Sequence, residues 1–206
     1  MKKIKIILAD DHGIVRKGLR SLLEMEDDLS VIGEAANGQA AVAETLRLRP
    51  DVVVMDLMMP KMDGTAATAE IRKSTNKVKI LLLTTYASSE GITRSLEAGA
   101  NGAIFKSSAD DTIVEAIRSI HKGVEYVSPD VKDLLRTDPP VPELTQKQLD
   151  ILTSVTRGLS NVDIAKEYGI AEITVRAHLK PIFAKLGAAN RTEAVAIALR
   201  KQLVKV

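Results

Sequence analysis

Residues 52–64 read VVVMDLMMPKMDG, a short apolar run that ends at Asp56 and passes into a segment containing a proline and a glycine. Further short apolar runs cover residues 4–9, 29–33, 80–83 and 102–105. Runs of this length, rich in β-branched and aliphatic residues and bounded by turn residues, predict β-strands. We therefore expect five strands in this part of the chain.

Amphipathic segments separate the predicted strands. Apolar residues recur three and four positions apart near residues 15–25, 40–48, 65–73, 90–98 and 111–121, which predicts five helices. Because the strands are apolar throughout, both faces of their sheet should be covered by helices. The sequence predicts an α/β fold with a five-stranded, parallel, doubly wound sheet.

The alternation of strands and helices stops after Val127, and residues 138–142 read DPPVP. Such a segment can continue neither a helix nor a central strand. We place a linker at residues 126–143, in which residues 129–136 form one or two helical turns. It separates an N-terminal domain at residues 1–125 from a C-terminal domain at residues 144–206. The C-terminal domain is predicted to be all-α, with four helices near 146–157, 161–168, 172–186 and 191–203.

Charge is unevenly distributed, although the formal net charge is only +2. Lys and Arg against Asp and Glu number 17 to 18 in residues 1–129, 2 to 4 in residues 130–143 and 10 to 5 in residues 144–206. The basic C-terminal third suits a polyanion, and equally an ordinary solvated surface. Aromatic residues make up 2% of the chain, which disfavours binding of unpaired bases by stacking.

The chain has no cysteine, which excludes disulfides, thiolate catalysis and cysteine-ligated zinc. No apolar run reaches the roughly 18 residues that a membrane span needs. Asp10 and Asp11 interrupt the N-terminal apolar run before the core of a signal peptide forms. We therefore expect a soluble protein of the cytoplasm.

Polar and charged side chains lie at the predicted strand ends: Asp10 and Asp11 after the first strand, Asp56 on the third, Thr84 on the fourth and Lys106 on the fifth. In a parallel sheet these ends share one edge, where ligands bind. Three converging carboxylates repel one another unless a cation joins them, and oxygen ligands favour Mg²⁺. A carboxylate can also attack a phosphoryl group, and Asp56 is the best nucleophile of the set.

In this order and at these strand ends, Asp10-Asp11, the run 56–64, Thr84 and Lys106 resemble the receiver domain of bacterial two-component response regulators. The resemblance covers residues 1 to about 125 and implies a sheet of the flavodoxin-like type. It implies a magnesium site formed by Asp10, Asp11, Asp56 and the carbonyl of Met58. It also implies that Asp56 accepts phosphate from a histidine kinase, and that Thr84 and Lys106 bind the phosphoryl group.

One position departs from the receiver pattern. Receivers usually carry an aromatic residue three positions before the lysine, and its movement reports phosphorylation; this chain has Ala103 there. Phe105 lies on the same strand face by the period of two, and Tyr86 follows Thr84 closely, so either is a candidate replacement. The phosphorylation site is intact in the sequence, whereas its usual readout is missing.

The C-terminal domain carries a second set of motifs: GLSNVDIA at 158–165, ITVRAHL at 173–179, KLG at 185–187 and NRTEA at 190–194. They resemble the LuxR-type helix-turn-helix domain of NarL/FixJ regulators over nearly all of residues 144–206. Ser160 can cap the first helix of the motif, and a turn through Gly169 can present the next helix to the major groove of duplex DNA.

By this resemblance, Arg176, Ala177 and Lys180 face base edges, while Thr174 and His178 contact the DNA backbone or hold the helix in place. A packing role for His178 and a solvated surface role for Arg176 and Lys180 are the alternatives. The residues do not specify a target sequence, because Arg and Lys can both bind guanine or neutralise phosphate.

Two residues depart from a rigid recognition helix. Ala171 replaces the usual serine at its N-cap, a loss of roughly 1 kcal/mol. Pro181 lies inside the helix and costs up to ~3 kcal/mol unless the helix bends or ends there. We expect a bend after Lys180 that leaves the DNA-reading half intact.

The two domains together predict a phosphorylation-regulated transcription factor, not an enzyme, in which phosphate on Asp56 promotes homodimers that bind paired half-sites in promoter DNA. The last helix is a candidate dimer seam or an internal core face. One rival keeps the fold but makes DNA binding independent of phosphate, with the receiver as a protein-docking surface; Ala103 motivates it. An enzymatic rival, a phosphatase with an aspartyl intermediate, needs a substrate pocket and an acid-base group that the sequence does not suggest.

Overall fold

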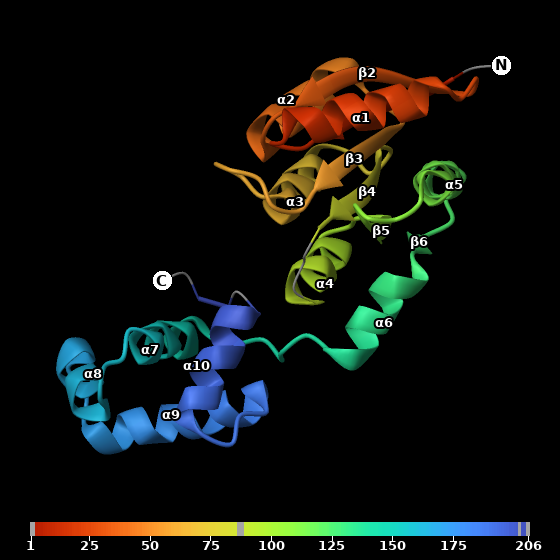
Figure 1. Ribbon diagram of the computed structural model, residues 1–206. Helices are drawn as coiled ribbons and strands as arrows, with labels where there is room; N and C mark the ends of the chain where they lie inside the picture. The colour runs from red at the N-terminus through yellow and green to blue at the C-terminus, as the bar shows by residue number, and fades with distance from the viewer. Residues whose placement is uncertain (1–2, 86–88, 202, 205–206) are drawn as a thin grey trace. The chain divides into compact units, whose positions relative to one another are not determined.

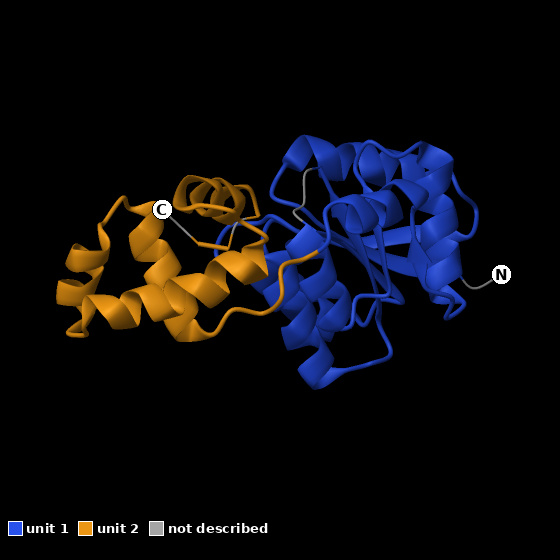
Figure 2. Ribbon diagram, turned by 90° about the horizontal axis from the view of Figure 1, so that it is seen from below, with its two compact units in different colours: residues 1–139 blue, residues 140–206 orange. Residues whose placement is uncertain are grey.

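The computed structural model of this protein describes residues 3–85, 89–201 and 203–204. The chain divides into two units, Met1–Pro139 and Pro140–Val206, so the division falls inside the DPPVP segment (Figure 2). Among the described residues, no helix combines the length and the hydropathy that crossing a membrane requires.

The N-terminal unit contains one parallel sheet in the order β2-β1-β3-β4-β5-β6 (Figure 1). Its strands are β1 (Ile4–Ala9), β2 (Leu29–Ala35), β3 (Val52–Asp56), β4 (Lys79–Thr84), β5 (Gly102–Phe105) and β6 (Tyr126–Val127). Its helices are α1 (Gly13–Glu24), α2 (Gly38–Leu48), α3 (Gly64–Ser74), α4 (Ser89–Glu97), α5 (Asp110–His121) and α6 (Pro129–Thr137). This is the predicted α/β fold.

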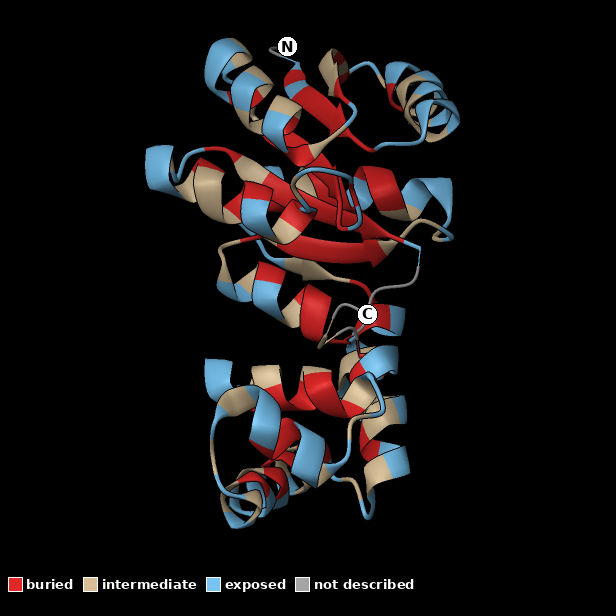
Figure 3. Cartoon of the chain, turned by 90° about the vertical axis from the view of Figure 1, so that its left-hand side faces the viewer, coloured by how far each residue is buried: buried red, intermediate tan, exposed pale blue. Residues whose placement is uncertain are grey.

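Alternate residues of each strand belong to two different cores, because side chains of a strand point to opposite faces of the sheet. Ile6 and Leu8 pack with α1 and α5 on one face, whereas Ile7 and Ala9 pack with α2, α3, α4 and α6 on the other. The central strands are buried along their length (Figure 3). Burial on both faces explains why the strands are continuously apolar in the sequence.

The prediction of five strands was wrong by one. The sixth, β6, has only two residues, and Tyr126 and Val127 pair with Gly102 and Ala103 of β5. A run of two residues shows no hydrophobic period, and β6 is held by its neighbour in the sheet rather than by its own pattern. Helix α6 follows at once, capped by Ser128, so both elements lie in the segment that we predicted as linker.

The C-terminal unit contains four helices, drawn from teal to blue in Figure 1: α7 (Gln146–Thr156), α8 (Asn161–Tyr168), α9 (Glu172–Leu186) and α10 (Arg191–Arg200). They enclose a separate apolar core to which α9 contributes Val175, Leu179, Ile182 and Leu186. Gly169 and Gly187 end α8 and α9 in the left-handed conformation, at φ 63° and 66°, where glycine is favoured because it has no Cβ.

Candidate functional site

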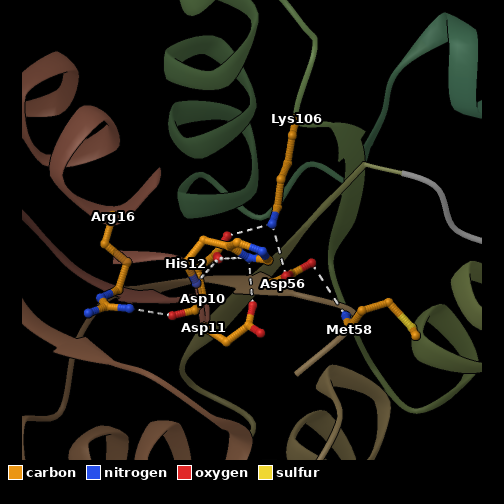
Figure 4. Close-up of polar contacts among 7 residues, drawn as sticks. All are labelled: Asp10, Asp11, His12, Arg16, Asp56, Met58 and Lys106. Carbon is orange, nitrogen blue, oxygen red and sulfur yellow. Dashed lines mark hydrogen bonds and ion pairs between the residues drawn. The ribbon is translucent and has the colours of Figure 1, made fainter. Parts of the chain in front are cut away.

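The carboxyl ends of β1, β3 and β5 bring two carboxylates and one ammonium together. The Nζ atom of Lys106 lies 2.6 Å from Oδ2 of Asp10 and 2.9 Å from Oδ2 of Asp56 (Figure 4). Asp10 and Asp56 are 2% and 3% exposed, so the contacts are shielded from solvent. β1 and β3 are neighbours in the sheet although β2 separates them in the sequence, which is the position where ligands bind in this type of fold.

Asp11 and His12 extend this cluster toward solvent. Nδ1 of His12 lies 2.7 Å from Oδ1 of Asp11, and the backbone N–H of His12 donates to Oδ1 of Asp10 at 2.8 Å. Asp10, Asp11, His12 and Asp56 each offer one ligand atom, and these atoms all lie within 4.8 Å of one another. We call Asp10, Asp11, Asp56 and Lys106 the acidic site. The sequence prediction did not include His12, although it follows the aspartate pair directly.

Burial and ion pairing together shift the pKa values of Asp56 and Lys106. It raises the pKa of Asp56 above its ordinary value of 3.8, against the lowering effect of Lys106, and the Asp10 carboxylate raises that pKa further. Burial alone would lower the pKa of Lys106, but hydrogen bonds to Asp10 and Asp56 outweigh it and raise that pKa. Lys106 is therefore a permanent cation, and it balances only one of the site's three carboxylates.

The loop after Asp56 is shaped by its backbone. A Cβ on Gly64 would lie 2.3 Å from the backbone oxygen of Asp56, so only glycine fits where α3 begins. Lys61 has a φ of 67°, a conformation that is uncommon for residues with a side chain. The N–H of Met58 points back to Oδ1 of Asp56 at 3.3 Å. This loop holds Met58, whose side chain is exposed, beside the Asp56 carboxylate.

Thr84 lies at the edge of the same site. The N–H of Lys106 donates to the carbonyl oxygen of Thr84 at 2.7 Å, which fixes the two residues side by side. The Oγ1 atom of Thr84 is buried and has no hydrogen-bond partner in the described part of the chain. A buried hydroxyl without a partner costs free energy, and a ligand at this edge of the site would give it a hydrogen bond.

Ala103, at the position of the missing aromatic residue, is fully buried. Its strand β5 pairs with β6, and its side chain shares a core with α6. Its carbonyl oxygen accepts a hydrogen bond from the N–H of Ser128 at 3.1 Å, and Val131 of α6 is buried in the same core. Phe105 is partly buried against that core, and Tyr86 lies outside the described residues. The strand that leads to Lys106 is thus directly connected to the segment that leads out of the N-terminal unit.

The helix-turn-helix pair is α8 and α9. Ser160 and Asp163 form a capping box at the start of α8, and Gly169 ends that helix. Arg191 of α10 donates to Oδ1 of Asn161 at 3.3 Å and to the carbonyl oxygen of Leu159. Arg191, which the sequence analysis did not single out, thereby ties the start of α10 to the start of α8.

Helix α9 presents the predicted DNA-reading residues on its open side. Arg176, Ala177 and Lys180 are exposed, whereas Thr174 and His178 are half-buried beside the apolar face of the helix. Arg176 pairs with Glu172 one turn earlier, with 2.7 Å between Nη2 and Oε1. Another molecule can therefore reach the exposed residues directly, whereas Thr174 and His178 are partly covered by the rest of the domain.

Both departures that we noted in α9 are visible in its structure. Ala171 occupies the N-cap and makes no capping hydrogen bond with its side chain. Pro181 lies inside the helix on its exposed side, and the helix continues through it to Leu186. The two features remove hydrogen bonds at the start and in the middle of the same helix.

Comparison with protein families assigns both units. The family described as "Response regulator receiver domain" matches residues 6–118, and the one described as "Bacterial regulatory proteins, luxR family" matches residues 142–198. The chain belongs to the response regulators with a LuxR-type helix-turn-helix domain. This confirms the family to which the sequence motifs pointed, and with it a regulator of transcription that binds DNA.

Three similar proteins match this chain over nearly its whole length. VraR of Staphylococcus aureus is 34% identical over 98% of this chain and 99% of its own length. The crystal structure of ChrA, from a heme-sensing two-component system, is 34% identical, with a TM-score of 0.60 over 99% of this chain and 100% of ChrA. RcsB of Salmonella enterica serovar Typhimurium, solved on promoter DNA with the phosphomimetic BeF₃⁻, is 25% identical, with a TM-score of 0.75 over 97% of this chain and 99% of RcsB.

Proposed function

We propose that this response regulator is switched by phosphorylation of Asp56 by a histidine kinase in the cytoplasm, and that the switch controls dimerisation and promoter binding by α9. The observation that carries the proposal is the buried contact of Lys106 with both Asp10 and Asp56, beside the unpartnered hydroxyl of Thr84. A nucleophilic carboxylate, a cation and a free donor are what phosphoryl transfer to Asp56 requires.

The residues of the acidic site fit a divalent cation. Three carboxylates face one ammonium, which leaves an excess of negative charge, and their oxygens match the ligands that Mg²⁺ prefers. Asp10, Asp11 and Asp56 would hold the ion, with the carbonyl of Met58 as a further ligand. When bound, Mg²⁺ neutralises the negative charge that develops on the transferred phosphoryl oxygens.

In the transfer step, a carboxylate oxygen of Asp56 attacks the phosphorus of the phosphohistidine. The bond between phosphorus and the imidazole nitrogen breaks as the bond to Asp56 forms, and the imidazole leaves with the electron pair. Lys106 exchanges its contact with Asp56 for a phosphoryl oxygen and keeps its contact with Asp10. The Thr84 hydroxyl donates to a second phosphoryl oxygen, which gives this buried group its hydrogen bond.

The signal passes from β5 to β6 and α6. A phosphoryl group adds about −1.5 to −2 charges at Asp56 and draws Lys106 toward it. Any shift of β5 is transmitted at Ala103, whose carbonyl is bound by Ser128 and whose side chain shares a core with Val131. A coupling of only ~1–3 kcal/mol between Asp56 and the DNA-binding state is sufficient for a switch.

DNA binding rests on α9, in which Arg176, Ala177 and Lys180 read base edges, and Thr174 and His178 contact the backbone or hold the helix. The exposed side of α9 supports this assignment. Two copies of the chain place two such helices on paired half-sites, so dimerisation strengthens binding without a new contact to the bases.

The test is the affinity of the full chain for its own promoter DNA, with and without acetyl phosphate and Mg²⁺. We expect phosphorylation to tighten binding by about 5–150-fold, the range that ~1–3 kcal/mol gives. Asp56→Asn should bind with the affinity of the unphosphorylated protein under both conditions. Equal affinity of the wild-type chain under both conditions would contradict the switch.

Ala103 favours a second candidate function, because the side chain that usually reports phosphorylation is absent. In that case the chain binds DNA independently of phosphate, and its receiver is a surface for docking another protein. The same measurement distinguishes the two functions: here wild type and Asp56→Asn bind equally well, and acetyl phosphate changes neither.

A further inference from the structure

Helix α9 carries an isoleucine in solvent at its first turn. Ile173 is 72% exposed, which makes it the most exposed large apolar side chain among the described residues of the C-terminal unit; Val162 and Leu199 are 46% and 45% exposed. Single exposed apolar residues are common on protein surfaces and need no explanation by themselves. The position of Ile173 on α9 is what makes it informative.

The exposed residues of α9 form one stripe. Ile173, Arg176, Ala177, Lys180, Pro181 and Ala184 share this face, at spacings of three and four positions, and we call them the outer stripe of α9. Val175, Leu179, Ile182 and Leu186 form the opposite, buried stripe. Ile173 is therefore directed away from the core, one turn before Ala177 on the same face, at the N-terminal end of the helix.

The N-terminal part of a recognition helix is the part that contacts base edges in the major groove. Arg176 and Lys180 in the same stripe carry the positive charge that the DNA backbone and guanine attract. Ile173 can neither donate nor accept a hydrogen bond. The apolar group that base edges offer in the major groove is the C5-methyl of thymine, so this is the group against which Ile173 can be buried.

We propose that Ile173 is a specificity-determining residue, which selects thymine in each half-site by contact with its C5-methyl group. Ala177, one turn further along the stripe, adds a second small apolar surface beside it. This inference rests on the proposed DNA binding by α9. It adds a base preference that Arg176 and Lys180 do not determine, since both can bind guanine or phosphate.

The experiment uses the full chain and a duplex carrying the strongest site that this chain selects from random sequence. Each thymine of the site is replaced in turn by deoxyuridine, which removes the methyl group and keeps the hydrogen-bonding edge. At one thymine of each half-site we expect wild-type binding to weaken about three- to fivefold, the loss of one buried methyl contact.

The variant Ile173→Ser should bind the thymine and deoxyuridine duplexes equally well. The exposed position and the similar helix propensities of Ile and Ser keep α9 folded. Ile173→Val, which retains branched methyl groups, should keep the preference for thymine. Val162→Ser, an exposed apolar residue on α8, is the matched control and should also keep it.

Two results overturn the inference while the proposed function stands: binding of the wild-type chain that no deoxyuridine substitution weakens, or a weakening that persists in Ile173→Ser. In the second case any loss of affinity in Ile173→Ser is the same on both duplexes, so Ile173 acts without the methyl group. Failure of the wild-type chain to bind any duplex overturns the proposed function and this inference together.

Discussion

Lys106 in the receiver contacts two buried carboxylates, whereas Arg176 and Lys180 on α9 extend into solvent. The ion pair of Arg176 in the described part of the chain is with Glu172 of its own helix. The charges of the acidic site are therefore held by the fold before any ligand arrives. Among the described residues, the side chains of Arg176 and Lys180 have no charged partner outside α9. The contacts of Lys106 are set by the fold alone. The contacts of Arg176 and Lys180 depend on the molecule that binds to the exposed side of α9.

This difference has a consequence for stability. Substitutions at or beside the acidic site should change stability through buried contacts and burial of charge, in either direction, whereas substitutions on the exposed side of α9 should leave the fold intact or improve it.

Gly64→Ala should destabilise the receiver by about 2–3 kcal/mol, because the new Cβ would lie 2.3 Å from the backbone oxygen of Asp56. The free energy of unfolding, measured by denaturant titration, checks this. Gly18→Ala is the matched control, since a Cβ on Gly18 meets nothing within 4 Å and α1 should gain about 0.5–1 kcal/mol. Equal effects of the two substitutions would mean that the loop at Asp56 is not constrained.

Pro181→Ala should stabilise the C-terminal unit by about 1–3 kcal/mol, because it restores a backbone donor in the interior of α9. Circular dichroism during thermal unfolding measures the gain. We expect DNA affinity to change less than about twofold, because the first half of α9 carries the predicted base contacts. A large gain in affinity would show instead that the proline holds α9 in a conformation that inhibits binding.

Asp56→Asn should raise the Tm of the metal-free receiver at neutral pH by a few degrees, as about 1 kcal/mol does in a domain of this size. Burial raises the pKa of Asp56 above 3.8, so the folded state holds the proton more tightly than the unfolded chain. The stability linked to this carboxyl is complete below 3.8 and is lost as pH rises through the folded pKa.

The difference in Tm between Asp56→Asn and the wild-type chain, both in EDTA, should accordingly shrink as the pH is lowered toward 3.8. Chelation matters because a bound cation would itself stabilise the ionised carboxylates. A wild-type chain that is more stable than Asp56→Asn at neutral pH without metal would contradict the electrostatic description of the acidic site.

Ala171→Ser should add about 0.5–1 kcal/mol to the C-terminal unit, since the N-cap of α9 has no side-chain hydrogen bond and a serine supplies one. Denaturant titration of the full chain detects the change in the C-terminal transition. Ala171→Gly is the comparison, because glycine allows the N-cap conformation without a hydrogen bond. A gain of the same size in both variants would assign the effect to the backbone instead of the cap.

The convergence of the acidic site could be predicted from the sequence, but its detailed geometry could not. The meeting of Asp10, Asp56 and Lys106 follows from a general property of parallel sheets, whose strand ends share one edge, so a strand pattern is sufficient to predict it. Their contact distances were not predictable, because they depend on how three strands align. The roles of these residues in phosphorylation remain predictions.

The features that the sequence did not reveal depend on neighbours far along the chain. β6 has two residues and exists because β5 provides its hydrogen-bond partners. Arg191 is bound to Leu159, 32 positions earlier, a contact that no local pattern indicates. Ile173 belongs to a motif that we had quoted, but its exposure became visible only when the buried stripe of α9 was known.

The most direct test of the account is the intact mass of the purified chain after incubation with Mg²⁺ and a phosphoryl donor, either acetyl phosphate or a phosphorylated histidine kinase. We expect a single acid-labile adduct of about 80 Da on the wild-type chain and none on Asp56→Asn. Absence of an adduct with every donor, or its persistence in Asp56→Asn, would contradict the assignment of Asp56 as the phosphoryl acceptor.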